Sequence, residues 1–342
     1  MMNRPPLLIA DGLIATTAIA ERLLSEAYGA VQVVTGEGLV GVSIDRRPVF
    51  ISRLCHPRQG WLPDYLRSRG VPYVFLLDDD FHALDADYDP LHAGYFGHPE
   101  VRATLDRFLR GAKAVWLMSE PFATRLRARL PGLDVRYVPP PVDLALFDAC
   151  RPEGGRPERP GPFVIGYAST RRPNVEALIV AMVQGAAERF GDSVRFEFIG
   201  WCPTAVAEHP LVTVMAATPD YATYVRTMLS RQWSAAIAPL GSHPFENAKT
   251  NLKFREYGAA RLPGIFSNVG LFSACVRHRD NGLLVPNEPT AWLEMIGLLR
   301  DDPAVGAALA NQAREDVESI HAQDRVAAQL RATFADCWAA IA

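Results

Sequence analysis

The sequence predicts an α/β protein of two domains, each built on a parallel sheet that is covered by helices. Short runs rich in β-branched residues alternate with longer amphipathic stretches along the whole chain, which is the pattern of βαβ units. A length of 342 residues is sufficient for two such domains. A segment without apolar side chains other than proline, 151–162, separates two stretches of similar pattern and is the predicted linker.

The predicted strands of the first half cover residues 31–34, 48–52, 73–77, 114–118 and 135–138. Predicted helices lie between them at 62–69, 99–111 and 121–130. The apolar run 7–20 is a candidate targeting segment, but Asp11 interrupts it and the run is too short to span a bilayer. The first domain is therefore predicted to cover residues 1–150, without a membrane-spanning segment.

The predicted strands of the second half cover residues 163–167, 195–200, 212–215, 234–239, 264–267 and 282–286. Helical periodicity fills the gaps at 174–190, 219–231, 252–261, 270–277 and 289–300. Residues 303–342 are rich in Ala, Arg, Gln and Leu and are predicted to be helical throughout. We expect a second domain over 151–320 and a terminal helix over 321–342 that packs back on the first domain.

The composition is that of an ordinary soluble globular protein. Hydrophobic residues make up 49% of the chain and charged residues 21%, which excludes wholesale disorder and collagen-like repetition. The 35 Lys and Arg nearly balance the 38 Asp and Glu, so we expect no nucleic-acid partner. The five cysteines are scattered without a Cys-x-x-Cys pair, which argues against disulfides and structural zinc and favours a cytoplasmic location.

The loop after the predicted strand 163–167 has the composition of a phosphate site. Gly166 allows close backbone approach, Ser169 and Thr170 supply hydroxyls, and Arg171 and Arg172 supply cationic donors near the start of a helix. A solvated basic turn before a proline at the first helical turn is an equally open interpretation of the same residues.

A second constellation lies at the start of the predicted helix 252–261. Thr250, Asn251 and Leu252 occupy the amino terminus, where unpaired backbone amides bind anions, and Lys253 adds a full charge. Glu256 follows about one turn later, at a distance suited to accepting the hydroxyl protons of a ribose. Taken alone, the pair also fits an ordinary Lys to Glu contact on a helix surface.

Four surrounding segments carry a further signal: 255–270 (REYGAARLPGIFSNVG), 281–286 (NGLLVP), 138–147 (VPPPVDLALF) and 196–200 (FEFIG). Their order and spacing resemble those of retaining glycosyltransferases of the family-4 kind, chiefly their second domain. The resemblance covers most of 114–320 and implies the GT-B fold, in which two Rossmann-like domains face a cleft. It also implies a nucleotide-sugar donor bound by the second domain and an acceptor bound by the first.

The resemblance assigns roles to residues of the second constellation. The glutamate that holds the donor ribose corresponds to Glu256, and the residues that cradle the diphosphate correspond to Asn251, Leu252 and Lys253. The Lys-Thr-Asn-Leu-Lys form, with Lys249 and Thr250, resembles a subgroup among polysaccharide and O-antigen gene products.

The resemblance also points to Arg171, and second to Arg172, as the arginine that neutralises the diphosphate. The sequence departs from the family pattern at Ala248, where a sugar-facing glutamate is usual, although Glu246 and Lys249 lie nearby.

Three consecutive carboxylates, Asp78, Asp79 and Asp80, follow the predicted strand 73–77, with His82 just beyond. Like charges at a strand end must meet donors, bind a cation or shift a pKa. An Asp-x-Asp manganese site, typical of a different glycosyltransferase fold, and a capped solvated turn are both open interpretations. By resemblance this strand end faces the acceptor, so Asp79, Asp80 and His82 are candidates for acceptor activation or sugar binding, with no metal expected.

The function predicted from these residues is sugar transfer from a nucleoside-diphosphate sugar to a saccharide or lipid-linked saccharide, without a cofactor. Arg171, Lys253 and the helix terminus would stabilise the charge of the leaving diphosphate. The resemblance alone implies retention of configuration and a role in cell-surface polysaccharide synthesis.

Two alternatives are a sugar-nucleotide epimerase of the same fold and a catalytically degenerate subunit that binds nucleotide sugars. The absence of the usual glutamate at Ala248 favours the second of these. Peripheral contact with the inner face of a membrane, through arginines of 102–129, is a further open possibility, since solvated helix faces explain these arginines equally well.

Overall fold

The computed structural model describes residues 4–39, 41–44, 46–151, 161–218 and 220–339. The chain forms two compact units. The first consists of Met1–Pro141, Asn247–Thr250 and Ile320–Ala342, and the second of Val142–Glu246 and Asn251–Ser319. The chain thus enters the second unit after Pro141 rather than near 150, because Phe147 is buried in the core of the second unit. Most of the predicted linker 151–162 lies outside the described residues.

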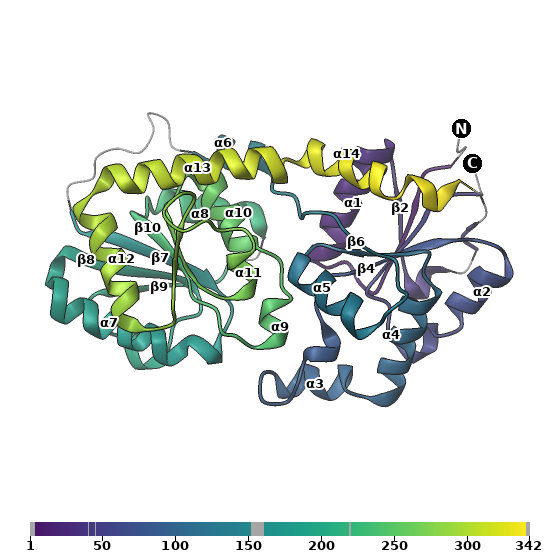
Figure 1. The fold of residues 1–342 in the computed structure, drawn as a ribbon, viewed down its shortest axis with the longest axis horizontal. Helices are drawn as coiled ribbons and strands as arrows, with labels where there is room; N and C mark the ends of the chain where they lie inside the picture. The colour runs from purple at the N-terminus through teal and green to yellow at the C-terminus, as the bar shows by residue number, and fades with distance from the viewer. Residues whose placement is uncertain (1–3, 40, 45, 152–160, 219, 340–342) are drawn as a thin grey trace. The chain divides into compact units, whose positions relative to one another are not determined.

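The first unit is built on a six-stranded parallel sheet (Figure 1) with the strand order β2-β1-β3-β4-β5-β6. The strands are β1 (Leu7–Ala10), β2 (Gln32–Thr35), β3 (Val49–Ser52), β4 (Tyr73–Leu77), β5 (Ala114–Leu117) and β6 (Val135–Tyr137). The order reverses between β1 and β3, so the first unit has the topology of a doubly wound sheet.

One strand of this sheet was not predicted. The run 7–20, interpreted from sequence as a candidate targeting segment, forms β1 and the first part of helix α1 (Ala15–Tyr28). β1 pairs on both sides and all four of its residues are buried. A strand that is buried on both faces has a continuous apolar sequence rather than an alternating one, which is why it resembles the apolar core of a leader.

Helices cover both faces of the first sheet. On one face, Phe50, Trp116 and their neighbours pack against α1 and α14 (Gln323–Thr333), which lie side by side in Figure 1. On the opposite face, Phe75 stacks on Phe108 of α4 (Pro99–Gly111) at 5.5 Å. The remaining helices of this unit are α2 (Leu62–Ser68), α3 (Pro90–Phe96) and α5 (Glu120–Arg129).

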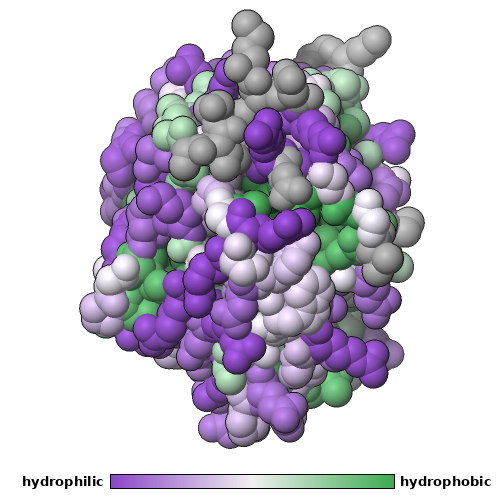
Figure 2. All heavy atoms as spheres, turned by 90° about the vertical axis from the view of Figure 1, so that its right-hand side faces the viewer, coloured by the Kyte–Doolittle hydropathy of each residue, from purple (hydrophilic) through white to green (hydrophobic). Residues whose placement is uncertain are grey.

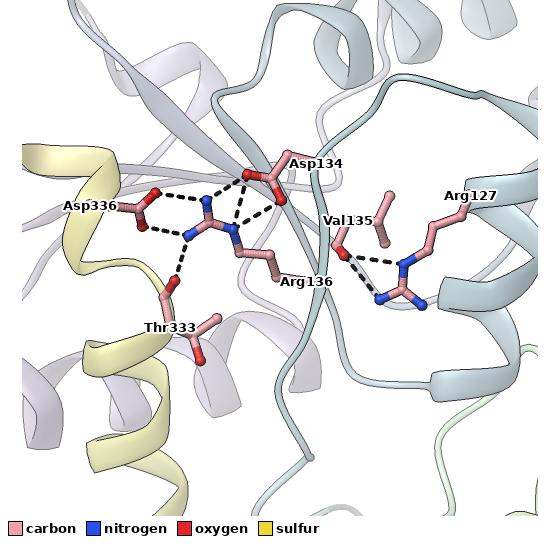
Figure 3. A network of polar contacts seen from close by, with 6 residues as sticks. All are labelled: Arg127, Asp134, Val135, Arg136, Thr333 and Asp336. Atoms are coloured by element: carbon pink, nitrogen blue, oxygen red, sulfur yellow. Dashed lines mark hydrogen bonds and ion pairs between the residues drawn. The ribbon is translucent and has the colours of Figure 1, made fainter.

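The carboxy-terminal segment is fastened to the first unit by a charged contact as well as by its apolar residues. Arg136 of β6 donates from both terminal nitrogens to Asp336, at 2.6 and 2.9 Å, and its Nε donates to Asp134 at 3.0 Å (Figure 3). Phe334 and Trp338 are buried beside Phe50. This end of the chain therefore completes the core of the first unit.

The second unit also has a six-stranded parallel sheet, with the order β12-β11-β10-β7-β8-β9. The strands are β7 (Phe163–Ser169), β8 (Val194–Gly200), β9 (Val212–Met215), β10 (Ala235–Ala238), β11 (Gly264–Ser267) and β12 (Leu283–Val285). All were predicted, most of them to within two residues. In chain order this is the 3-2-1-4-5-6 arrangement of the dinucleotide-binding fold, and it reverses between β7 and β10.

Two helical layers enclose the second sheet. One face packs against α7 (Glu176–Phe190) and α12 (Pro289–Asp301). The other face packs against α6 (Leu144–Ala149), α8 (Tyr221–Ser230), α10 (Leu252–Ala260), α11 (Gly270–Ser273) and α13 (Pro303–His321). A short helix, α9 (Pro244–Asn247), lies between β10 and α10. Two Rossmann-like units confirm the predicted α/β fold class.

The predicted continuous helix over 303–342 is interrupted. Ala322 has an extended conformation with ψ of 137°, and it separates α13 from α14. A further short helix covers Ala335–Trp338. The interruption allows α13 to pack in the second unit while α14 packs on α1 in the first, which helix propensity alone does not reveal.

No helix among the residues that the structure describes is long and apolar enough to cross a bilayer. The face of the molecule in Figure 2 is largely hydrophilic, with separate small hydrophobic patches. The five cysteines are free thiols.

Candidate functional site

The carboxyl ends of β7 and β10 form the topological switch point of the second unit, where doubly wound sheets bind their ligands. Ser169 ends β7, and the exposed Thr170 follows it. After β10, the chain runs through α9 to the amino terminus of α10. The two loops that were singled out from the sequence therefore start from neighbouring strands of one sheet.

The amino terminus of α10 offers backbone donors. The first helical hydrogen bond runs from the Arg255 amide to the Asn251 carbonyl at 3.2 Å, so the amides of 252–254 precede the helical pairing. The Asn251 side chain makes no capping hydrogen bond and instead accepts from Arg255 Nε at 3.1 Å. Leu252 is exposed at this end. An anion at this position would meet free amides and the positive end of the helix dipole.

Lys253 and Glu256 form a pair one turn apart on α10. Lys253 Nζ lies 2.8 Å from Glu256 Oε2, and Tyr224 of α8 donates its hydroxyl to the same oxygen at 3.0 Å. The ammonium of Lys253 also lies 5.2 Å from the centre of the Tyr224 ring. Glu256 is buried, so its carboxylate is held in one orientation by these two donors.

The two arginines after β7 lie in different surroundings. Arg171 is 73% exposed at its side chain, and its guanidinium is 3.8 Å from Glu176 at the start of α7. Arg172 is half-buried and interacts with the hydroxyl of Tyr167. Burial raises the pKa of the Tyr167 hydroxyl while Arg172 opposes that shift. Arg172 is thus the better ordered of the two, whereas Arg171 extends into solvent.

Gly166 serves packing rather than ligand approach, which corrects the interpretation from sequence. It lies inside β7, and a Cβ there would come within 1.7 Å of the Trp233 indole. The buried Trp233 donates to Glu197 at 2.9 Å, so its ring cannot move away without losing that hydrogen bond.

The carboxylate of Glu246 joins the two loops of the switch point in the second unit. Glu246 of α9 is fully buried and accepts from Asn174 Nδ2 at 3.3 Å. A Cβ on Gly241 would lie 2.4 Å from Glu246 Oε2, so a larger residue there would displace this carboxylate. The Ala248 side chain is buried as well. Glu246, the glutamate closest in sequence to Ala248, is therefore bound to Asn174 within the second unit.

Lys249 and Thr250 belong to the first unit and not to the second. Lys249 Nζ lies 3.2 Å from Asp79 Oδ1, at the carboxyl end of β4. Burial raises the pKa of the Asp79 carboxyl, with Lys249 opposing the shift and Asp78 adding to it. Lys249, predicted to bind the nucleotide sugar, thus lies against Asp79, predicted to bind the acceptor or the sugar.

Each of the three consecutive aspartates has a cationic partner of its own. Asp78 accepts from Arg53 at 2.7 Å, Asp79 lies at Lys249, and Asp80 accepts from Arg129 at 2.8 Å. The three neighbouring carboxylates therefore lie close together because each one meets a cationic hydrogen-bond donor. Among the described residues, no group of three or more His, Cys, Asp or Glu side chains could hold a metal ion.

Asp80 and His82 lie inside a network of ion pairs. Asp80 has no exposed surface, and Arg129 links it to His82 Nδ1 at 3.1 Å. The other ring nitrogen of His82 lies 2.9 Å from Asp106 of α4. Burial lowers the pKa of His82, and the nearby Arg129 lowers it further, while Asp106 opposes both. A fully buried Asp80 cannot touch an acceptor, so its candidate role is corrected to positioning Arg129 and His82.

Sequence reasoning missed two charged residues at the switch point of the first unit. Asp11 directly follows β1, and Arg53 directly follows β3 with a positive φ of 61°. The signal was present, because a polar residue after a short apolar run also identified Asp78. Asp11 was overlooked because β1 was not recognised as a strand, whereas Arg53 follows the predicted strand 48–52 and was not singled out.

No protein-family model and no curated protein matches the sequence. Solved structures of similar fold include sucrose-phosphate synthase from Thermosynechococcus elongatus, with a TM-score of 0.70 and 16% identity over 98% of this chain and 100% of that chain. HepE from Anabaena, solved in complex with UDP and glucose, has a TM-score of 0.68 and 12% identity over 97% of this chain and 100% of that chain. TarM gives 0.63 and 11% over 87% of this chain, which spans 56% of the length of TarM. These similarities establish the two-domain fold.

Proposed function

We propose that this protein, which has the GT-B fold, is a glycosyltransferase that uses a nucleoside-diphosphate sugar as donor. The observation that carries the proposal is the Lys253 and Glu256 pair at the amino terminus of α10, beside the switch point of the second sheet. Backbone amides, a cation and an oriented carboxylate suit a diphosphate joined to a ribose. The similarly folded HepE has been solved with UDP and with UDP-glucose, which supports a uridine diphosphate donor.

In the proposed reaction, the bond between the sugar and the diphosphate breaks and negative charge develops on the leaving oxygen. Lys253 and the amides of 252–254 stabilise this charge, because they are positioned before the reaction begins. Arg172, with Arg171 from the same loop and Ser169 and Thr170 beside them, completes the diphosphate contacts. Glu256 accepts the ribose hydroxyls while Tyr224 and Lys253 keep its carboxylate in place.

The proposal assigns the acceptor to the carboxyl edge of the first sheet. Asp79 is the candidate acceptor-binding carboxylate there, because its side chain is partly exposed and its pKa is raised by burial. Transfer with retention and without a metal, onto a saccharide or lipid-linked saccharide of a surface polysaccharide, remains part of the proposal. So does peripheral membrane contact.

The test is a thermal-shift panel of UDP, GDP and ADP and their common sugar conjugates. A ligand at a hundred times its dissociation constant stabilises the native state by about 2.7 kcal/mol, which is readily measured. We expect one nucleotide series to stabilise the protein and Lys253→Ala to abolish the shift. An absence of stabilisation by every member of the panel contradicts the proposal.

Incubation with the stabilising donor then separates glycosyl transfer from its alternatives. Release of nucleotide that depends on an added saccharide supports a transferase, and formation of an isomeric donor identifies an epimerase. Binding without turnover identifies a binding subunit. The anomeric configuration of the product, and the rate in the presence of EDTA, test retention and metal independence.

A further inference from the structure

The carboxyl edge of the first sheet carries a second group of charged side chains, at the place where its strand order reverses. The loops after β1 and β3 flank this switch point, and they carry Asp11 and Arg53. We refer to Asp11, Arg53, His56 and Asp78 as the polar cluster. In doubly wound sheets, ligands bind outside the carboxyl ends of the strands at such a reversal.

Buried polar atoms in the polar cluster and in the adjacent Ser52 lack a hydrogen-bond partner among the residues that the structure describes. Arg53 NH1 donates to Asp78 Oδ2 at 2.7 Å, and the Thr16 hydroxyl donates to the same oxygen. In the described part of the chain, Asp78 Oδ1, Arg53 Nε and the hydroxyl of the fully buried Ser52 at the end of β3 have no hydrogen-bond partner. Buried polar atoms are satisfied in native proteins, so these atoms indicate a hydrogen-bonding ligand or ordered water.

The backbone at Arg53 also departs from ordinary geometry. Its φ of 61° is unusual for a residue with a side chain, and such strain persists where the surroundings hold it. The guanidinium lies 4.8 Å from the centre of the Phe81 ring, and Phe81 in turn stacks on Phe96 of α3 at 3.9 Å. Arg53 is therefore clamped between Asp78 and an aromatic stack that holds α3 at this edge.

Exposed apolar side chains lie close to Asp11 in the chain and on α3, whose Phe96 stacks on the Phe81 ring beside Arg53. Leu13 and Ile14 follow Asp11 directly and are 79% and 42% exposed. On α3, Leu91 is 80% exposed and Tyr95 lies one turn further on the same face of the helix. The Tyr95 hydroxyl donates a hydrogen bond to the Cys55 sulfur, and burial, together with the charge of the nearby Asp11, raises the pKa of Tyr95. We refer to Leu13, Ile14, Leu91 and Tyr95 as the apolar rim.

We propose that the first unit binds an acceptor with two chemically different parts: sugar hydroxyls that face the polar cluster, and an attached apolar group that lies on the apolar rim. The inference rests on the proposed function and narrows its acceptor to a saccharide with an apolar aglycone. Carboxylates and a guanidinium together accept and donate the hydrogen bonds that sugar hydroxyls offer. The cluster combines two carboxylates, a guanidinium and an imidazole, so it offers both donors and acceptors to neutral hydroxyls.

The experiment compares methyl and octyl glycosides of the same hexose, in the glucose, galactose, mannose and N-acetylglucosamine series, below the concentration at which octyl glycosides form micelles. Dissociation constants are measured on the full chain by NMR titration, with and without UDP. Burial of two or three methylene groups corresponds to about fifteenfold to sixtyfold tighter binding of the octyl glycoside.

Three variants locate the effect. Leu91→Ser should bring the octyl and methyl affinities to within about twofold, because it removes the most exposed side chain of the apolar rim. Asp11→Asn should weaken both glycosides by about tenfold, because it replaces a charged acceptor. Val214→Ser is the control, since Val214 of β9 is an exposed aliphatic side chain in the second unit, outside the apolar rim, and it should leave the octyl preference intact.

The possible failures are distinguishable. If UDP and UDP-sugars bind and are consumed but methyl and octyl glycosides bind equally, or neither binds, the inference is wrong and the proposed function stands. If no nucleotide binds, the proposed function fails. An octyl preference that Leu91→Ser leaves unchanged places the apolar group elsewhere and overturns the assignment of the apolar rim.

Discussion

At the scale of single residues, neighbours in the sequence take different roles because they meet different partners. Asp79 is partly exposed and lies at Lys249, whereas Asp80 is fully buried between Arg125 and Arg129. The first can contact a ligand, and the second organises the arginines and, through Arg129, His82. Three identical side chains in a row therefore do not form one functional unit.

Lys253 is the residue on which the proposed chemistry depends most. Lys253→Ala should lower the rate of sugar transfer by about tenfold to a thousandfold, the usual effect of losing one preorganised donor to a developing charge. The same range applies to Arg171→Ala, and we expect Arg172→Ala to have the larger effect of the two arginines, since Arg172 is the more ordered. Single-turnover rates with saturating donor measure the effect, and wild-type rates in all three variants contradict the assignment.

Gly166→Ala tests the corrected role of a residue first assigned to ligand binding. The added Cβ collides with Trp233, so we expect the second unit to lose about 1–3 kcal/mol of unfolding free energy. Gly94→Ala is the control, because a Cβ at that helical position meets nothing within 4 Å and should be neutral or slightly stabilising. Denaturant unfolding measures both. A variant as stable as the wild type would show that β7 and Trp233 separate easily.

At the scale of elements, the carboxy-terminal segment packs its apolar residues into the first unit and forms an ion pair between Asp336 and Arg136 of β6. Hydrogen bonds from Arg136 lower the pKa of Asp336 from its ordinary value to about 2. A lowered carboxyl pKa contributes stability above the unfolded value and loses it as the pH falls through the folded value. The contribution of this ion pair should therefore be present at pH 7 and vanish near pH 2.

Asp336→Asn tests this dependence. The variant should be less stable than the wild type at pH 7, by less than about 1 kcal/mol because Asp336 is 63% exposed and solvent screens the pair. The difference should shrink between pH 4 and pH 2 and should also decrease in high salt. Denaturant titrations at several pH values measure it. A difference that stays constant down to pH 2 would show that the carboxylate charge is irrelevant to this contact.

At the scale of the whole molecule, the first unit is assembled from segments that are distant in the sequence. Ile320–Ala342 belongs to it together with Met1–Pro141. Val326, Leu330, Phe334 and Trp338 are all buried in its core. A chain that lacks its last segment would therefore leave one face of the first sheet uncovered.

Ending the chain at Ser319 should unfold the first unit while sparing the second. Each of the four lost side chains contributes about 1.5–3 kcal/mol of burial, which together approaches the stability of a typical domain. We expect strong binding of a hydrophobic dye and loss of one unfolding transition. Stabilisation by nucleotide, assigned to the second unit, should remain measurable in the truncated chain. Loss of both would show that the second unit does not fold without the first.

The sequence by itself determined the α/β class, the strands of the second sheet and the pairing of Lys253 with Glu256. These follow from local rules, since hydrophobic periodicity defines a strand or a helix and helical geometry places residues i and i+3 together. The tertiary structure decided that 7–10 is a central strand, that a helix breaks at Ala322, and which cation each aspartate meets. Those features depend on contacts between residues far apart in the chain, which the local sequence pattern does not predict.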